Sequence, residues 1–455
     1  MKKTLSMLLC IAMIPIIMMG CMKKTDEVPI SQALNDETTT TSSTDSITEE
    51  VTLKFMTSAK IAESKQYESI INLVTEKNPK IKIELLVIPG ETADFDKKAM
   101  ITLMAGDEAD LIYINTLTAN KFSAGNMLKP LDDYASEQGY DLDKTYGSSI
   151  NKIDGRTYML PAFRDVHITI YNKDLFDKAG IPYPDNKTFT WEKYIEYAKA
   201  ITDENEGIYG SYMLEWDTYF TFSAKQKGIP AYKEDGTSNF DDPAWAESMK
   251  FFADLGNVYR VQPDIVTFKT KKMQWDGFVS GKYGMFVVGN WATILLSEMD
   301  SYPREWKAGI AIMPMAETDK NASLSIVGGY SICSTTKHER EAFEAVKIMA
   351  ENEWTLPGKL PARIDLSDEE MTKVAESLVE SLDFDNITIE DVKATILSPD
   401  ITLVPEKVLG PGMTTINSLV EQVGELYASG QRTLEEAMAE LKTKSDKAIV
   451  ESTEQ

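Results

Sequence analysis

Histidine and cysteine are scarce in this sequence. Among its 455 residues there are only two His, His167 and His338, and three Cys. These two side chains supply most of the ligands that proteins offer to zinc, so their scarcity argues against a zinc site. We expect neither a metal site nor a cofactor.

Positive charge is also in short supply. The 47 Lys and Arg residues stand against 72 Asp and Glu residues, which gives a net charge of −25. Nucleic acids and anionic lipids are both bound by basic surfaces, so this charge argues against either as a partner. The hydrophobic fraction of 43% is that of an ordinary globular protein, and the length leaves room for two or three domains.

Long hydrophobic runs are missing except near the N-terminus. The run from Leu5 to Met19 is shorter than the roughly 20 residues that a transmembrane helix needs, but it follows Lys2-Lys3 and suits a secretory signal. Its end, Gly20-Cys21, resembles the cleavage box of bacterial lipoproteins. We therefore expect residues 1–20 to be removed and Cys21 to carry a lipid. That lipid would be the protein's only membrane contact, at the outer face of the cytoplasmic membrane. An ordinary signal peptide followed by a coincidental Cys is the alternative.

The next segment, residues 21–50, has no apolar periodicity and contains the Thr- and Ser-only run Thr38–Thr44. Such a segment cannot bury enough surface to order itself, so we expect a disordered, solvated tether. Cleavage removes Cys10 and lipidation occupies Cys21. Cys333 is then left without a partner for an intramolecular disulfide.

From Val51 onward, strand-like and helix-like patterns alternate. Strand patterns cover residues 51–56, 81–88, 110–114 and 283–288, and helical patterns at 62–75 and 94–104 separate the first three. This alternation is typical of parallel βαβ units and predicts an α/β fold. After residue 339 helical patterns dominate, at 340–351, 368–382, 412–428 and 433–449.

A series of short motifs runs through this part of the chain. They are Ala105–Ile112, Leu128–Tyr134, Gly155–Pro161, Tyr171–Phe176, Gly180–Pro182, Thr190–Glu192, Phe278–Met285, Gly289–Trp291, Gly328–Tyr330 and Leu360–Arg363. In this order and spacing they make the chain resemble the extracellular solute-binding proteins (family 1) of carbohydrate ABC importers. The resemblance implies a periplasmic-binding-protein-like (type II) α/β fold. Such a fold has two lobes with central mixed sheets, hinge crossovers and a ligand cleft.

The resemblance also implies where the chain passes between the lobes. Crossings are expected near Leu160–Arg164, Ile310–Pro314 and Gly328–Ser334. The N-terminal lobe would then hold residues 51–162 and about 313–335. The C-terminal lobe would hold residues 163–312 and about 336–455.

Aromatic residues are the first candidates for the ligand site, because sugars present C–H faces that aromatic rings bind and hydroxyl rims that polar side chains bind. Trp291 is the strongest, since it follows Gly289-Asn290 at the start of a predicted helix. In Glu215-Trp216-Asp217 a ring between two carboxylates suits a stacking platform with hydroxyl acceptors, or else a surface turn. Trp275 either contacts the ligand or caps the core.

Polar residues directly after predicted strands are further candidates. Lys60 follows the first strand and Asn115 the third, and loops at the C-terminal ends of strands are where α/β lobes bind ligands. A solvated loop is the alternative for each.

Other candidates depend on the predicted crossings. By the resemblance Asp165 faces the cleft, although it could instead pair with Arg164 and support the hinge. Tyr330 follows two glycines and is expected to reach the cleft. Arg363 could hydrogen-bond ring hydroxyls or form a surface salt bridge. Trp191, in contrast, is predicted to pack inside its lobe behind the N-cap residue Thr190.

Together these features predict a binder rather than an enzyme, and the resemblance implies a monomer. The sequence has no nucleophile elbow, phosphate-binding loop or zinc motif. The resemblance implies that the protein captures a carbohydrate, by expectation an oligosaccharide, and delivers it to ABC permease subunits. The alternatives are a peptide or another non-sugar solute, a sugar sensor or adhesin, and a glycosidase built on two of the many carboxylates.

Overall fold

The structure is a computed structural model that describes residues 49–64, 67–89, 95–317, 320–356, 359–380 and 382–453. The predicted signal peptide, Cys21 and nearly all of the predicted tether lie outside these residues. In the part of the chain that is described, no helix combines the length and the apolar character that a membrane crossing requires.

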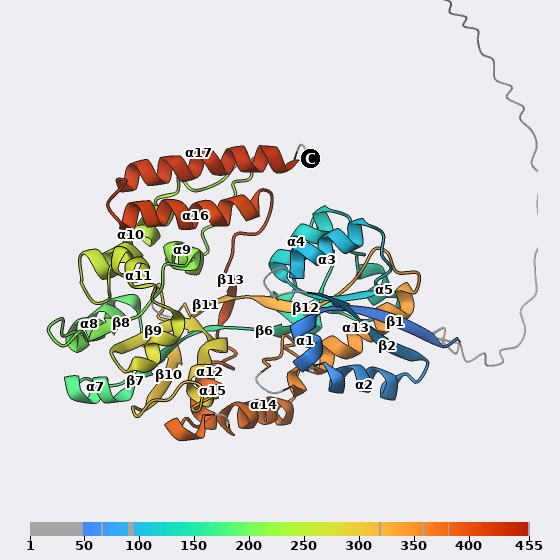
Figure 1. Ribbon diagram of the computed structural model, residues 1–455, viewed down its shortest axis with the longest axis horizontal. Coiled ribbons are helices and arrows are strands. Elements are labelled where there is room, and N and C mark those ends of the chain that lie inside the picture. Colours follow the sequence, from blue (N-terminus) through green and yellow to red (C-terminus); the bar gives the residue numbers. More distant parts are fainter. Residues whose placement is uncertain are drawn as a thin grey trace, which may run out of the picture. The chain divides into compact units, whose positions relative to one another are not determined.

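The first sheet has five strands in the order β2-β1-β3-β12-β6 (Figure 1). They are β1 Val51–Ser58, β2 Ile81–Ile88, β3 Leu111–Asn115, β12 Val327–Ile332 and β6 Leu160–Arg164. β1 pairs in parallel with β2 and β3, whereas β12 runs antiparallel to β3 and β6. The predicted parallel βαβ units are thus confirmed, and they lie in a mixed sheet.

Helices cover both faces of this sheet, because alternate residues of each strand point to opposite faces. On one face α2 Glu68–Lys77 and α13 Glu339–Asn352 pack around Phe55 of β1. On the other face α3 Phe95–Met104 and α4 Thr116–Ala124 pack around Met56. The helix predicted at 62–75 is divided, since α1 covers Ala59–Ser64 and α2 begins at Glu68.

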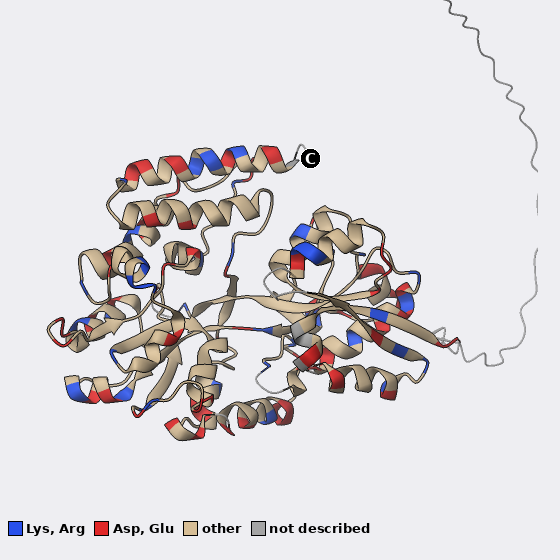
Figure 2. Ribbon diagram, viewed as in Figure 1, with Lys and Arg blue, Asp and Glu red and all other residues tan. Residues whose placement is uncertain are grey.

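The second sheet has four strands in the order β10-β7-β9-β8. They are β10 Ala308–Ile312, β7 His167–Asn172, β9 Tyr283–Gly289 and β8 Tyr209–Ser211. None of these strands contains Lys, Arg, Asp or Glu, and Figure 2 shows the charged residues gathered instead on helices and loops. This composition is typical of a sheet that is buried on both faces.

Helices and a two-stranded ribbon surround the second sheet (Figure 1). α9 Asp217–Gln226 packs beside α10 Pro243–Asn257 and α16 Met413–Ala428, and α16 packs beside α17 Leu434–Thr453. The remaining helices are α5 Asp132–Glu137, α6 Leu142–Tyr146, α7 Lys173–Ala179, α8 Trp191–Ile201, α11 Ile265–Lys271, α12 Ile294–Ser297, α14 Asp368–Glu380 and α15 Ile389–Ala394. The short strands are β4 Lys152–Ile153, β5 Arg156–Thr157, β11 Ala322–Ser325 and β13 Thr402–Pro405. Single 3-10 turns are η2 Gly147–Ser149, η3 Trp275–Ser280, η4 Asn290–Thr293, η5 Glu353–Thr355 and η6 Asp383–Asp385.

The chain passes between the sheets in three places. It leaves β6 of the first sheet and enters β7 of the second at Asp165-Val166. It returns at Ile326, between β11 and β12. It leaves again after Ile364, whose N–H still donates to Thr145 of the first lobe, and before α14, which packs in the second core.

Two of the predicted crossings are therefore wrong. Residues 310–314 do not cross: β10 lies inside the second sheet, antiparallel to β7, and Met313 and Met315 stay in the same core. The segment 328–334 does not cross either, because β12 lies wholly in the first sheet. Both segments are short apolar runs, and an apolar run does not tell which of two sheets it joins.

The predicted lobe boundaries need the matching correction. Residues 313–325 stay with the second lobe, where β11 pairs with β13 and Leu324 is buried in the core. α13 belongs to the first lobe, since Phe343, Val346 and Met349 are buried against its sheet. Only six residues separate β12 from α13, so the helix folds back onto the sheet that the chain has just left.

Other local predictions are confirmed. The late helices form as α13, α14, α16 and α17, close to the predicted bounds. Trp191 is buried inside its lobe, where its indole N–H donates to Gln226, and the Thr190 side chain caps α8 by accepting from the Lys193 N–H.

Candidate functional site

Four chain segments lie side by side where the lobes meet. The first link, residues 164–166, joins β6 to β7, and the second link, residues 325–327, joins β11 to β12. The Asp165 N–H donates to the Ile326 carbonyl, which ties the two links together. On the other side of the first link, Val166 exchanges hydrogen bonds with Asn290: its N–H donates to the side-chain oxygen at 2.9 Å and its carbonyl accepts from the Asn290 N–H. The Glu406 N–H, just beyond β13, donates to Ser325 of the second link.

Three tryptophans of the second lobe meet beside Asn290. We name Trp216, Trp275 and Trp291 the tryptophan platform. The Trp291 ring centroid lies 6.1 Å from that of Trp216 and 5.4 Å from that of Trp275. Trp291 is 42% exposed, whereas the other two are half-buried. The sequence predicted all three as ligand contacts, and the structure brings them together.

Local backbone geometry explains how the platform is built. The Trp291 ring folds back over Gly289, where a Cβ atom would lie only 2.3 Å from the indole nitrogen, so a larger residue there would displace the ring. Trp216 occupies the N-cap position of α9 and stacks on Tyr219 one turn later, with 5.8 Å between ring centroids and 11° between ring planes. Trp275 begins η3 and also contacts Tyr302.

The two carboxylates beside Trp216 have different surroundings. Glu215 is half-buried, and within the described part of the chain its Oε2 atom has no hydrogen-bond partner. Asp217 forms an ion pair with Lys407. Because an unpaired buried oxygen is costly, Glu215 is the carboxylate with capacity left for a donor from a ligand.

Asp165, also predicted to face the ligand, is buried in the hinge. Its carboxylate accepts a hydrogen bond from the Ile326 N–H, and its carbonyl accepts one from the Ser325 hydroxyl at 2.6 Å. Burial raises the pKa of Asp165 to about 7, and the nearby Glu406 carboxylate adds to the rise. The supporting role considered from the sequence is therefore the one that the structure shows, with Ile326 rather than Arg164 as the partner.

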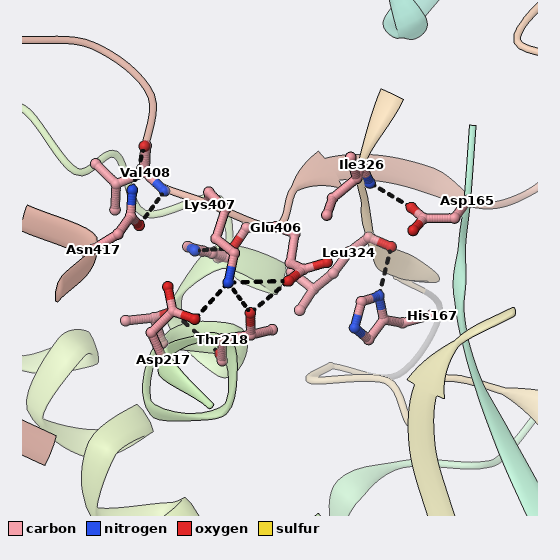
Figure 3. A network of polar contacts seen from close by, with 12 residues as sticks. Asp165, His167, Asp217, Thr218, Leu324, Ile326, Glu406, Lys407, Val408 and Asn417 are labelled. Carbon is pink, nitrogen blue, oxygen red and sulfur yellow. Dashed lines mark hydrogen bonds and ion pairs between the residues drawn. The ribbon is translucent and has the colours of Figure 1, made fainter. Parts of the chain in front are cut away.

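A buried polar network lies on the other side of the links (Figure 3). The Lys407 ammonium contacts Asp217, Glu406 and the Thr218 hydroxyl, and that hydroxyl donates to Glu406 at 2.7 Å. Burial alone would lower the pKa of Lys407, but the Glu406 and Asp217 carboxylates outweigh it and raise that pKa. The network fastens the segment after β13 to the start of α9.

Beside this network a cavity of about 240 Å³ lies between the lobes. We name it the interlobe cavity. The first lobe contributes Asn115, Thr116, Leu117 and Ser148–Asn151, the second link contributes Ser325–Val327, and the second lobe contributes Leu403–Lys407 and Leu409. None of the three platform tryptophans lines it. Sequence reasoning missed Ser149, Asn151, Glu406 and Lys407, since nothing in their local pattern distinguishes them from surface loops.

The other predicted site residues have mixed outcomes. Asn115 lines the interlobe cavity, and its side-chain oxygen also caps α4 by accepting from the Thr118 N–H at 2.9 Å. The side chain of Lys60 lies outside what the structure describes. Arg363 lines neither region, because its guanidinium pairs with Asp365 at 2.7 Å on the first lobe. That is the surface salt bridge considered as the alternative.

Tyr330 does not reach the cleft, and this prediction is wrong. The side chain is fully buried in the first lobe among Phe55, Tyr67 and Tyr113. β12 pairs with β3 in an unbroken register that places Tyr330 opposite Tyr113. Alternation along the strand therefore points Tyr330 to the face of the sheet that carries this core.

Potential metal ligands do not gather in the part of the chain that the structure describes, where no cluster of three or more His, Cys, Asp or Glu side chains could hold an ion. Cys333 is buried and forms no disulfide with any residue that the structure describes. The site therefore offers aromatic faces, hydroxyls, amides and paired charges. These groups can bind a neutral polar molecule through stacking and hydrogen bonds.

The architecture is that of a two-lobed, type II periplasmic binding protein, with mixed sheets joined by hinge segments. The sequence profile of the bacterial extracellular solute-binding proteins matches residues 58–355, well over half of the chain. The chain belongs to this family.

Known proteins resemble the chain at low identity. A binding protein of Brucella abortus is 25% identical over 292 residues, covering 63% of this chain and 69% of that protein. The mannitol-binding protein of Pseudomonas aeruginosa is 24% identical over 354 residues, covering 73% of this chain and 79% of that protein. Among solved structures, the ABC substrate-binding protein Lmo0181 of Listeria monocytogenes, in complex with cycloalternan, superposes with a TM-score of 0.68. It is 21% identical, and the match covers 88% of this chain and 99% of that one.

Proposed function

We propose that this protein captures a carbohydrate, an oligosaccharide rather than a single sugar, and delivers it to the permease of an ABC importer. The observation that carries the proposal is the tryptophan platform. Three indole rings from separate segments converge, the middle one is 42% exposed, and the carboxylate oxygen of the adjacent Glu215 has no partner. This combination suits sugar C–H faces and hydroxyl donors. The relative named as a mannitol-binding protein and the similar structure solved in complex with cycloalternan support the same ligand class.

Binding alone suffices for this function, so the proposal needs no catalytic residue. The three crossings would let the lobes close around a ligand held on the platform. A permease that prefers the closed form would then receive loaded protein in preference to empty protein. That is population shift, and it requires only that the ligand bind the closed state more tightly than the open one.

The test is titration calorimetry of the full chain against mono- and oligosaccharides, with di- and tripeptides included. Trp291→Ala should lower the affinity for the best sugar at least about 30-fold, because truncating a central aromatic contact costs about 2 kcal/mol or more. Tyr183→Ala is the matched control, because Tyr183 is 41% exposed and lies in the same lobe outside the platform. The control should bind like the wild type.

Two results would contradict the proposal. Binding of a peptide with no response to any sugar would reassign the ligand class. An unchanged sugar affinity in Trp291→Ala would mean that the ligand does not bind at the platform.

We further propose that the protein is a lipid-anchored monomer at the outer face of the cytoplasmic membrane, and the Gly20-Cys21 motif supports this location. Labelling cells with palmitate should mark the wild type and not Cys21→Ser, and the variant should leave the membrane fraction. Label in the variant would refute anchoring at Cys21.

A further inference from the structure

The interlobe cavity and the tryptophan platform lie on opposite sides of the first link. In an extended chain, successive residues direct their backbone groups to opposite sides. Asp165 bonds to Ile326, and Val166 bonds to Asn290. The lateral order is therefore Asn290, first link, second link, β13. At about 4.8 Å per neighbour, Asn290 and β13 are about 14 Å apart. None of the platform tryptophans lines the cavity.

Two polar side chains that line the cavity have no hydrogen-bond partner among the described residues. The Ser149 hydroxyl is one, and the residue is only 2% exposed. The Asn151 side-chain nitrogen is the other. Buried polar groups in folded proteins nearly always have partners, so two without them on one cavity wall point to an occupant that supplies acceptors.

Several other polar groups of the wall are already engaged. The Thr116 hydroxyl donates to the Val327 carbonyl at 3.0 Å, and the Ser325 hydroxyl donates to Asp165. The Lys407 ammonium is paired with Asp217 and Glu406 within the network. Of the two groups without a partner, the Ser149 hydroxyl can donate or accept and the Asn151 amide nitrogen can only donate. Both are uncharged, which favours a neutral ligand with acceptor oxygens.

The remaining lining and the volume of the cavity limit the size and chemical class of the ligand further. Leu117, Ile150, Leu403 and Val404 give the cavity aliphatic walls. Its volume of about 240 Å³ lies below the roughly 300–1,000 Å³ of sites for drug-sized ligands. Asn151 and Leu409 also line a wider groove of about 760 Å³ between α4 and the end of α17, which provides a route of access.

We propose that the interlobe cavity is a second binding site, separate from the platform, that takes a small neutral polyol. Its hydroxyl oxygens accept hydrogen bonds from Ser149 and Asn151, and its C–H groups contact the aliphatic walls. Both lobes and the second link line the site, so its affinity depends on the angle between the lobes. Occupancy is thereby coupled to the hinge. This inference does not depend on the proposed carbohydrate function of the platform.

The test is saturation-transfer NMR on the full chain, titrated with erythritol as the probe. Thermal shift is unsuitable, because polyols stabilise folded proteins without binding at a site. Asn151→Leu removes the free donor at nearly constant volume and should weaken erythritol binding about fivefold. Ile150→Trp fills the cavity and should abolish the binding. Trp291→Ala should bind erythritol like the wild type.

Each other outcome overturns the proposal. Equal transfer to erythritol in the wild type, Asn151→Leu and Ile150→Trp would mean that the cavity holds only water. Loss of transfer in Trp291→Ala would place erythritol on the platform. Circular dichroism verifies that each variant folds, and Asn151→Leu decides alone if Ile150→Trp does not.

Discussion

The two sides of the first link differ in the kinds of side chain that form them. On the Asn290 side, three tryptophans from separate segments of a single lobe form a half-open aromatic surface. On the Ile326 side, aliphatic and small polar side chains from both lobes enclose a cavity beside a charged network. The platform thus exists whatever the angle between the lobes, whereas the cavity exists only where the lobes meet.

This difference gives the two sides different roles: the platform supplies affinity for a ligand, and the cavity responds to the angle between the lobes. Rings already in contact within one lobe bind a ligand without having to be assembled, and preorganisation of this kind lowers the cost of binding. A cavity shared between two lobes instead reports their relative position. Variants of the links and of each side therefore test whether the two sides differ in this way.

The largest effect is expected at Asp165, which lies between the two sides. Burial raises its pKa to about 7 in the folded protein, against about 4 in an unfolded chain. Between these pH values only the folded state holds the proton, so the free energy of unfolding falls as the pH rises from about 4 to 7. Asp165→Asn should remove this loss and stabilise the protein at pH 8 by up to about 4 kcal/mol, with little change at pH 4.

The measurement is chemical denaturation of both proteins across this pH range. Burial lowers the pKa of His167, which acts in the opposite direction. The difference between the wild type and Asp165→Asn cancels that contribution. A difference that does not change with pH would show that the Asp165 carboxyl is not protonated near neutral pH.

On the cavity side, Lys407→Met should destabilise the fold by about 1–3 kcal/mol. The substitution leaves the Asp217 and Glu406 carboxylates, which are 15% and 11% exposed, without their shared cation. The estimate lies below that for a fully buried pair because the Lys407 side chain is 25% exposed. A double-mutant cycle with Asp217→Asn measures the coupling, and no coupling would mean that the network does not hold β13 to α9.

The hydrogen bonds on the two sides of the first link can be compared directly. Asn290→Ala leaves the buried Val166 N–H without an acceptor and should cost about 2 kcal/mol. Ser325→Ala removes the donor to the Asp165 carbonyl and should cost about 1 kcal/mol. Urea denaturation of both variants gives the comparison. A larger loss of unfolding free energy from Ser325→Ala than from Asn290→Ala would mean that the hydrogen bond on the Ile326 side contributes more to stability.

The smallest effect distinguishes the platform rings from one another. Trp216 is half-buried on Tyr219, so Trp216→Ala should lower the free energy of unfolding by about 1–2 kcal/mol. Trp291 is 42% exposed, so Trp291→Ala should change it by less than about 0.5 kcal/mol while weakening sugar binding. Equal destabilisation would show that Trp291 is part of the core rather than a ligand contact.

Much of the fold could be predicted from local patterns. Apolar periodicity located β1, β2, β3 and β9 and the late helices, because the apolar pattern of a strand or helix can be seen within a short stretch of sequence. The same patterns could not show that β10 stays in the second sheet or that α13 returns to the first. Those choices depend on pairing between residues far apart in the chain.

The candidate site was predicted in part for the same reason. Trp291, Trp216 and Trp275 could be named from neighbouring glycines, carboxylates and helix starts, but no local signal shows that their rings touch. Tyr330 was misplaced because its register opposite Tyr113 of β3 sets the face to which it points, and local sequence does not reveal the pairing of distant strands. Ser149 and Asn151 line a cavity only because residues of the second lobe lie opposite them.

The sequence by itself determined the α/β class, most of the helices and strands and the acidic charge, since each depends on composition or on short-range periodicity. It also marked the tryptophans and identified the family that the chain resembles. Tertiary structure alone decided which segments cross between the lobes, which rings meet, where Asp165 is buried and that a cavity lies between the lobes. Strand pairing and burial depend on contacts between residues far apart in the chain, so a short stretch of sequence does not reveal their free energy.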